Sequence, residues 1–135
     1  MEQIIRKHVS EPYFTLICEG KKTTEGRLYK DEFVEMKNGD IIEFFNDDEI
    51  ERRAVRVEIC DITRYPNFEE YLKVELENAL PNLISKYQQQ VEIETMHNKD
   101  KLIDDGVKIY RSFYSEESEK TFGVAAIRFK LLLLI

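Results

Sequence analysis

Three consecutive segments of β-strand character constrain the fold of this chain more than any other feature of its sequence. They are rich in threonine, valine, isoleucine and phenylalanine, and they span Lys22–Tyr29, Ile41–Phe45 and Ala54–Ile62. In the third segment apolar and polar residues alternate, which indicates a strand with one buried face. Short polar stretches such as the turn at Lys37–Asp40 separate the segments, and strands joined in this way favour antiparallel pairing.

Helical patterns lie on both sides of these strands. The other expected elements are a strand over Gln3–Val9, a helix capped by Ser10 and ended by Gly20, a helix capped by Asn67 and interrupted by Pro81, a helix over Lys99–Phe113, a short helix beginning at Ser115 and an apolar, interior strand over Gly123–Leu134. The pattern over Ser85–Thr95 fits helix or loop. This order predicts an α+β fold, a small mixed or antiparallel barrel or curved sheet with helices at its side.

Length and charge limit the possible partners. A chain of 135 residues suits one domain, and 42% hydrophobic residues are enough for one core. The formal net charge is −7, and binding to a long DNA duplex depends on neutralising phosphates. We therefore expect no long duplex DNA as a partner. A local basic site for a short or single-stranded ligand remains compatible with this charge.

The cysteines and histidines indicate neither a disulfide scaffold nor a metal site. Cys18 and Cys60 lie among apolar residues, so we expect buried, reduced thiols. His8 and His97 have no partner at metal-ligand spacing, and we expect no metal and no cofactor. The sequence shows no signal peptide and no apolar stretch of about 20 residues. We expect no membrane association and a cytoplasmic location.

The segment Gly20–Arg27 concentrates charge just after the end of the first helix. On a regular strand Glu25 and Arg27 face the same way, so the carboxylate can hold the guanidinium ready for a phosphate or a base edge. The stem of Lys22 is long enough to reach the same place from the start of the strand, and Gly26 leaves space for a ligand beside the backbone. The alternative is a solvated strand face with surface ion pairs that contribute little.

Gly20, Lys22, Glu25 and Arg27 match the spacing G-x-K-x-x-E-x-R, and in this they resemble the ASCH domain family of the PUA-like superfamily. The similarity extends over most of the chain except residues 81–105. It implies one ASCH domain over residues 1–135, with a PUA-like β-barrel and flanking helices. It further implies a cleft, lined by Lys22, Glu25 and Arg27, for RNA or a nucleotide-like ligand.

Residues near the end of the helix over Lys99–Phe113 are further candidates for this cleft. Tyr114 is suited to contact a base, because aromatic rings stack on bases. Tyr110 and Phe113 follow the helical period, and we expect Phe113 in the core. Ser115 and Glu117 are expected to close the cleft opposite the motif or, alternatively, to cap a helix.

Three functions fit the sequence. The first is binding of a nucleotide or RNA. The second is an amidohydrolase, because some ASCH proteins deacylate acylated cytidine with a lysine, a threonine three residues later and a distant glutamate. In this chain the candidate catalytic residues are Lys22, Thr24 and Glu25, with Glu75 or Glu77 as the distant glutamate, but Glu25 stands where the threonine is expected. A carboxylate beside Lys22 favours the charged amine. The third is a protein-interaction domain without a small ligand.

Overall fold

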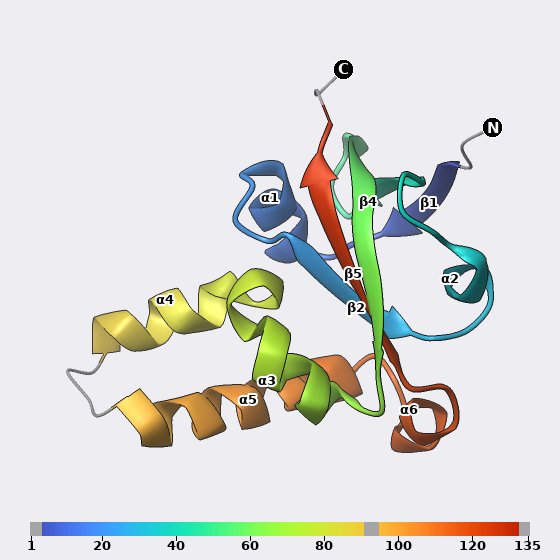
Figure 1. The fold of residues 1–135 in the computed structure, drawn as a ribbon. Helices are drawn as coiled ribbons and strands as arrows, with labels where there is room; N and C mark the ends of the chain where they lie inside the picture. The colour runs from blue at the N-terminus through green and yellow to red at the C-terminus, as the bar shows by residue number, and fades with distance from the viewer. Residues whose placement is uncertain (1–3, 91–94, 133–135) are drawn as a thin grey trace.

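Five strands form one curled sheet that closes about half of a barrel (Figure 1). The computed structural model describes residues 4–90 and 95–132. The order across the sheet is β1-β3-β4-β5-β2. The strands are β1 (Ile4–His8), β2 (Thr24–Leu28), β3 (Ile41–Asn46), β4 (Arg53–Tyr65) and β5 (Val124–Leu131). This mixed α+β architecture confirms the expected fold class.

The helices pack on both sides of the sheet. The described helices are α1 (Tyr13–Cys18), α2 (Glu32–Glu35), α3 (Phe68–Ala79), α4 (Pro81–Gln90), α5 (Thr95–Arg111) and α6 (Glu116–Phe122). Residues of α1 and α2 pack on the inner side of the sheet, and residues of α3, α4 and α5 on its outer side. Figure 1 shows α3, α4 and α5 gathered to one side of the sheet, with α1 above them. The change from α3 to α4 at Pro81 confirms the predicted interruption. None of the described helices is long and apolar enough to span a bilayer.

Strand β2 pairs with β5 and not with β3, so the prediction of antiparallel pairing through three successive strands is wrong at this step. Glu25 of β2 lies opposite Ile127 of β5, whereas β3 pairs antiparallel with β4 and parallel with β1. The connection from β2 to β3 contains α2, whose Phe33 is buried. The two strands are thus joined by a helical segment and not by a tight turn, and β4 and β5 lie between them in the sheet.

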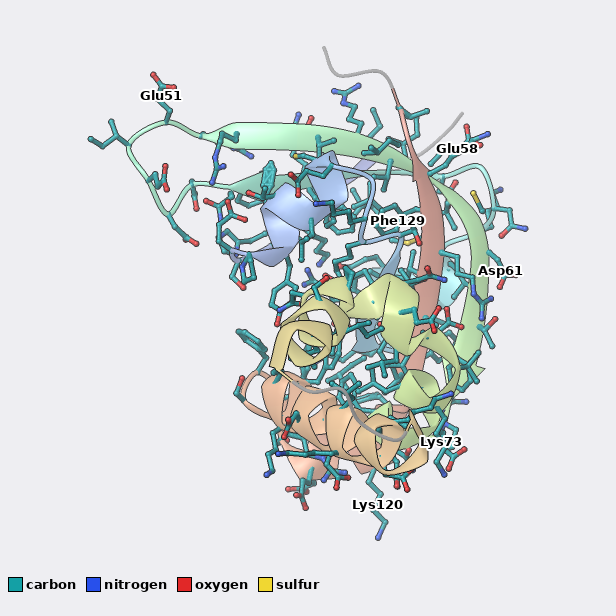
Figure 2. All side chains as sticks on the ribbon, turned by 90° about the vertical axis from the view of Figure 1, so that its left-hand side faces the viewer. Glu51, Glu58, Asp61, Lys73, Lys120 and Phe129 are labelled. Carbon is teal, nitrogen blue, oxygen red and sulfur yellow. The ribbon has the colours of Figure 1, made fainter. Side chains whose placement is uncertain are left out.

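Two apolar cores lie on opposite sides of the sheet, and side chains fill the space between sheet and helices (Figure 2). The inner core contains Phe14 and Ile17 of α1 together with the alternating residues Val55, Val57 and Ile59 of β4. The outer core lies between the sheet and α3 to α5. Its largest fully buried members are Phe68, Tyr71, Leu72 and Leu80.

Strand β5 is buried on both faces because it separates these two cores. Val124 and Ala126 belong to the outer core, whereas Ala125, Ile127 and Phe129 belong to the inner one. A strand covered on both faces has a nearly continuous apolar sequence. Its place between β4 and β2 confirms the predicted interior position, and residues 133–134 of the predicted strand lie outside the described residues.

Local capping signals are confirmed at two helices and wrong at one. The Asn67 side chain accepts a hydrogen bond from the Glu70 amide (2.8 Å), and Ser115 accepts one from Ser118 (3.1 Å). Ser10 does not cap α1, which begins at Tyr13 without a side-chain cap. The Glu11 carboxylate instead accepts a hydrogen bond from the Thr15 amide, because it reaches one turn into the helix.

The cysteines are free thiols, but they are not buried as expected. Cys18 is half-buried and Cys60 is exposed. On β4 the buried Val55, Val57 and Ile59 share one face. Strand alternation therefore directs Cys60 to the opposite, solvent-exposed side.

Candidate functional site

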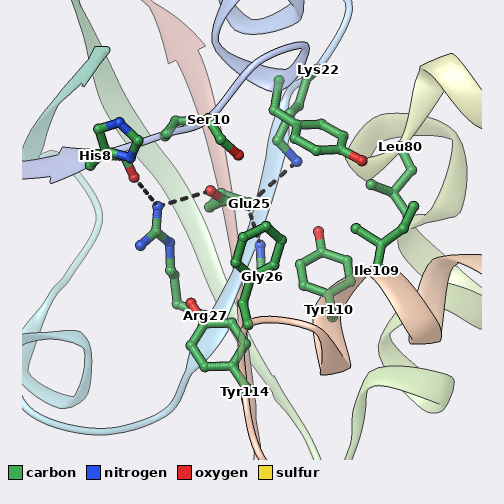
Figure 3. A pocket seen from close by; sticks show the side chains of 13 residues that line it. His8, Ser10, Lys22, Glu25, Gly26, Arg27, Leu80, Ile109, Tyr110 and Tyr114 are labelled. Atoms are coloured by element: carbon green, nitrogen blue, oxygen red, sulfur yellow. Dashed lines mark hydrogen bonds and ion pairs between the residues drawn. The ribbon is translucent and has the colours of Figure 1, made fainter. Parts of the chain in front are cut away.

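A pocket of about 390 Å³ opens between the sheet and the end of α5. One wall comes from the end of β1, α1 and β2, and the other from the helical layer (Figure 3). The lining residues are His8, Val9, Ser10, Tyr13, Lys22, Glu25, Gly26, Arg27, Leu80, Ile109, Tyr110, Phe113 and Tyr114. The volume lies in the range of sites that hold small molecules.

Glu25 and Arg27 lie together on one face of β2, as strand alternation predicts. Arg27 Nη2 donates to Glu25 Oε2 (3.2 Å) and to the backbone carbonyl of His8 (2.9 Å). The two hydrogens of Nη2 are thereby used, and the N–H groups on Nε and Nη1 are left for Tyr114 or a ligand. The Arg27 side chain is 19% exposed. Its guanidinium is thus held in one orientation at the pocket wall.

Lys22 lies beside Glu25 but is almost fully buried, with a relative exposure of 1%. Its ammonium donates to the carbonyls of Thr24 (2.8 Å) and Ala79 (2.6 Å), and Nζ lies 3.4 Å from Glu25 Oε1. Ala79 is the last residue of α3, so Lys22 places a positive charge at the negative end of that helix. Three acceptors occupy the three N–H groups of this ammonium.

Burial and neighbouring opposite charges shift the pKa values of Lys22 and Glu25. Burial alone raises the pKa of Glu25, but the positive charges of Lys22 and Arg27 and the Gly26 amide outweigh it and hold the pKa below its ordinary value. Burial lowers the pKa of Lys22, and Glu25 only partly compensates. Glu25 does raise the pKa of Lys22, as expected, but burial lowers it by more, and the sequence-based expectation did not include this burial.

The backbone at Gly26 meets an aromatic ring and not a cavity on the side where a Cβ would stand. A Cβ at this position would approach the Tyr71 ring to 2.7 Å. The glycine is therefore required for β2 to pack against α3. Tyr71 fills the space on this side of β2, and Gly26 also lines the pocket. The Tyr71 hydroxyl in turn lies 3.0 Å from that of Tyr110, which lines the pocket.

Aromatic residues from α5 and the turn after it form the helical wall. Tyr110 and Tyr114 stack on the ring of Phe68, with centroids 4.7 and 5.7 Å away. Phe113 is 62% exposed and lines the pocket, so its predicted place in the core is wrong. Helical spacing alone favours burial of Phe113. The helix ends at Arg111, and the following turn directs this ring away from the core.

The hydroxyl and carboxylate of the possible hydrolytic set lie on the other side of β2. Thr24 Oγ1 donates to Glu75 Oε1 (3.3 Å), and Glu75 is bound by Arg128 and Tyr65. Neither Thr24 nor Glu75 lines the pocket. The structure therefore separates Thr24 from the face that carries Glu25 and Arg27.

Ser115 and Glu117 do not line the pocket. The Ser115 side chain caps α6, and the Glu117 carbonyl accepts a hydrogen bond from the Thr121 hydroxyl (2.8 Å). The capping role that the sequence offered as an alternative is the one observed for Ser115.

His8 lies beside two acidic residues that are distant in sequence. Its Nε2 is 3.1 Å from Asp48 and 3.6 Å from Asp47. This proximity follows from the parallel pairing of β1 with β3, which brings the ends of both strands to one edge. The three side chains are exposed, and their potential ligand atoms lie within 4.8 Å of one another. Histidine spacing in the sequence did not indicate this cluster.

Comparisons with known proteins agree with the fold. The family model of the ASCH domain matches residues 8–133. The crystal structure of the hypothetical protein PH0355 is 34% identical, with a TM-score of 0.71 over 96% of this chain and 100% of that one. The solution NMR structure of protein PF0455 from Pyrococcus furiosus is 32% identical, with a TM-score of 0.65 over 98% and 100%. No curated protein matches the chain.

Proposed function

Because this chain belongs to the ASCH domain family, which is proposed to bind RNA, we propose that its pocket binds one nucleotide unit of an RNA or a free nucleotide. The observation that carries this proposal is the fixed guanidinium of Arg27, held by Glu25 and the His8 carbonyl at the pocket wall. A planar guanidinium with free N–H groups suits a phosphate or a base edge.

Several features of the pocket support a ligand of this class. The wall opposite β2 is aromatic, and a base gains affinity by stacking on such rings. Lys22, Glu25 and Arg27 together carry a net positive charge, which favours an anionic ligand. The pocket is also too small for a duplex, and bases within a duplex are not free to enter it.

The binding function is preferred over hydrolysis of an acylated nucleoside. Hydrolysis needs a hydroxyl or an activated water beside a base in the pocket. The Thr24 hydroxyl is bonded to Glu75 on the opposite face of β2, and the Lys22 ammonium is surrounded by acceptors. Incubation with N-acylated cytidine is expected to release no cytidine.

The proposal is tested by measuring thermal shifts of the wild-type protein with nucleosides, 5′-mononucleotides and short single-stranded RNAs, followed by calorimetric titration. Arg27→Lys keeps the positive charge beside Glu25 but loses the planar set of donors. Because each hydrogen bond to a charged group contributes about 1.5–3 kcal/mol, affinity for the best ligand should fall about 10- to 100-fold.

The matched control is Arg56→Lys, because Arg56 also pairs with a glutamate but does not line the pocket. Its affinity for the ligand should equal that of the wild type. Absence of any thermal shift across the panel, or equal binding by Arg27→Lys and the wild type, would contradict the proposal.

A further inference from the structure

Phe113 is an aromatic side chain exposed at the edge of a charged pocket. It is 62% exposed, which is unusual for a large apolar ring in this molecule. The other exposed large apolar residues, such as Val34, Ile50 and Val74, do not line the pocket. A single exposed apolar side chain is ordinary at a protein surface, but an aromatic ring at the rim of a pocket with polar groups offers a base a surface to stack on.

The neighbouring aromatic rings differ from Phe113 in what covers them. One face of Tyr110 and one face of Tyr114 stack on Phe68. Among the side chains that the structure describes, those of residues 4–85 and 99–132, Phe113 has no stacking, edge or cation contact of this kind. Of the three rings in this wall, Phe113 is the most exposed.

The backbone that carries Phe113 is fixed by hydrogen bonds. The Phe113 amide donates to the Tyr110 carbonyl (3.0 Å), and the Ser112 amide donates to Lys108 (3.1 Å) and Ile109 (3.2 Å). The Ser112 hydroxyl also donates to the Ile109 carbonyl (2.5 Å). The ring is therefore presented from an ordered turn, and a ligand that stacks on it need not order the backbone first.

Charge on the molecule restricts how a longer ligand could be held. The chain has a net charge of −7, so attraction of many phosphates contributes little. Within the pocket Arg27 keeps the N–H groups on Nε and Nη1 for Tyr114 or a ligand, whereas the Lys22 ammonium is surrounded by acceptors. Affinity for a second nucleotide must then come mainly from its base.

We propose that the ligand is single-stranded RNA of at least two nucleotides, with one base in the pocket and an adjacent base stacked on Phe113. This inference rests on the proposed function and specifies its ligand class. A free mononucleotide would fill the pocket and leave the outward part of the Phe113 ring uncovered. A duplex would present neither base.

The test is titration of the wild type, Phe113→Ala and Phe113→Trp with a 5′-mononucleotide and with RNA tetranucleotides of a single base type. Phe113→Ala should weaken tetranucleotide binding about 5- to 150-fold, the range expected for loss of one base–aromatic stack. It should weaken mononucleotide binding by a clearly smaller factor, because a mononucleotide has no second base to stack on the exposed ring. Phe113→Trp should restore tetranucleotide binding, because tryptophan also offers a stacking surface.

Val74→Ala is the matched control, because Val74 is exposed and apolar but does not line the pocket. The inference is overturned if Phe113→Ala leaves tetranucleotide affinity unchanged, or if it weakens mononucleotide and tetranucleotide equally. Either result leaves the proposed function intact, since the wild type still binds. If the wild type binds neither ligand, the proposed function itself fails.

Discussion

Glu25 and Glu75 are two nearly buried carboxylates on opposite faces of β2, the first on the strand itself and the second on α3, and of these two only Glu25 lines the pocket. Glu25 is bound by Lys22, Arg27 and the Gly26 amide, and the pocket opens beside it. Glu75 is bound by Arg128 and by hydroxyl groups of β2 and β4.

The arginines of the two groups explain the difference. Arg128 also donates to Asp61 and to the Thr63 hydroxyl (2.9 Å), so its donors are shared among several protein acceptors. Arg27 is held through one nitrogen and keeps donors at the pocket wall. A buried ion pair thus indicates a ligand site only where a cavity adjoins it and donors remain free. The Glu75 group is interpreted as a structural connection between α3 and the sheet.

The largest expected effect is the loss in free energy of unfolding when the carboxylate charge of Glu25 or of Glu75 is removed. Glu25→Gln leaves the ammonium of Lys22 and the guanidinium of Arg27 without their counter-charge in a buried place, and should cost about 3–5 kcal/mol. Glu75→Gln should cost about 1–2 kcal/mol, because Arg128 keeps Asp61 and is partly exposed. Urea denaturation measures both, and an equal or reversed order would contradict this comparison.

The next effect concerns two adjacent lysines in different environments. Lys22→Met leaves the carbonyls of Thr24 and Ala79 without a donor and should lower the free energy of unfolding by about 2–4 kcal/mol. Lys21→Met should change it by less than about 0.5 kcal/mol, because Lys21 is exposed and its ion pair with Glu19 lies at the surface. A loss below about 0.5 kcal/mol for Lys22→Met in denaturant unfolding would show that Lys22 has no structural role.

A smaller effect is expected from pH. The pKa of Glu25 is lowered in the folded protein by Lys22 and Arg27, which outweigh its burial. The ion pair therefore stabilises the fold above about pH 4.3, the ordinary value for glutamate, and the stabilisation is lost as pH falls through the folded pKa. The stability difference between the wild type and Glu25→Gln should shrink from pH 6 towards pH 3, by at most about 1.4 kcal/mol per pH unit. A constant or growing difference would show that Glu25 does not titrate in this way.

Local features of the site could be predicted from the sequence, because they depend on residues close together in the chain. The shared face of Glu25 and Arg27 follows from strand alternation, and the turn conformation of Gly20, with φ of 75°, follows from the helix end. Local patterns also predict a mixed or antiparallel sheet. They do not predict the pairing of β2 with β5, because these strands lie about 100 residues apart in the sequence.

Other features depend on contacts that local patterns do not contain. The buried state of Lys22 depends on the carbonyl of Ala79, 57 residues away, and a charged residue in a strand is usually exposed. Phe113 has helical spacing but follows the end of α5, so its direction depends on where the helix stops. Boundaries of this kind are the least predictable part of a sequence pattern.

The most direct test follows the two arginines at once by ¹H–¹⁵N NMR during titration with the tightest-binding 5′-mononucleotide. The Nε–H signal of Arg27 and the amide signal of Gly26 should shift and saturate together. The Nε–H signal of Arg128 should stay in place, because its group lies on the other face of β2. Saturating shifts at Arg128 with an unchanged Arg27 would place the ligand elsewhere and contradict the proposed site.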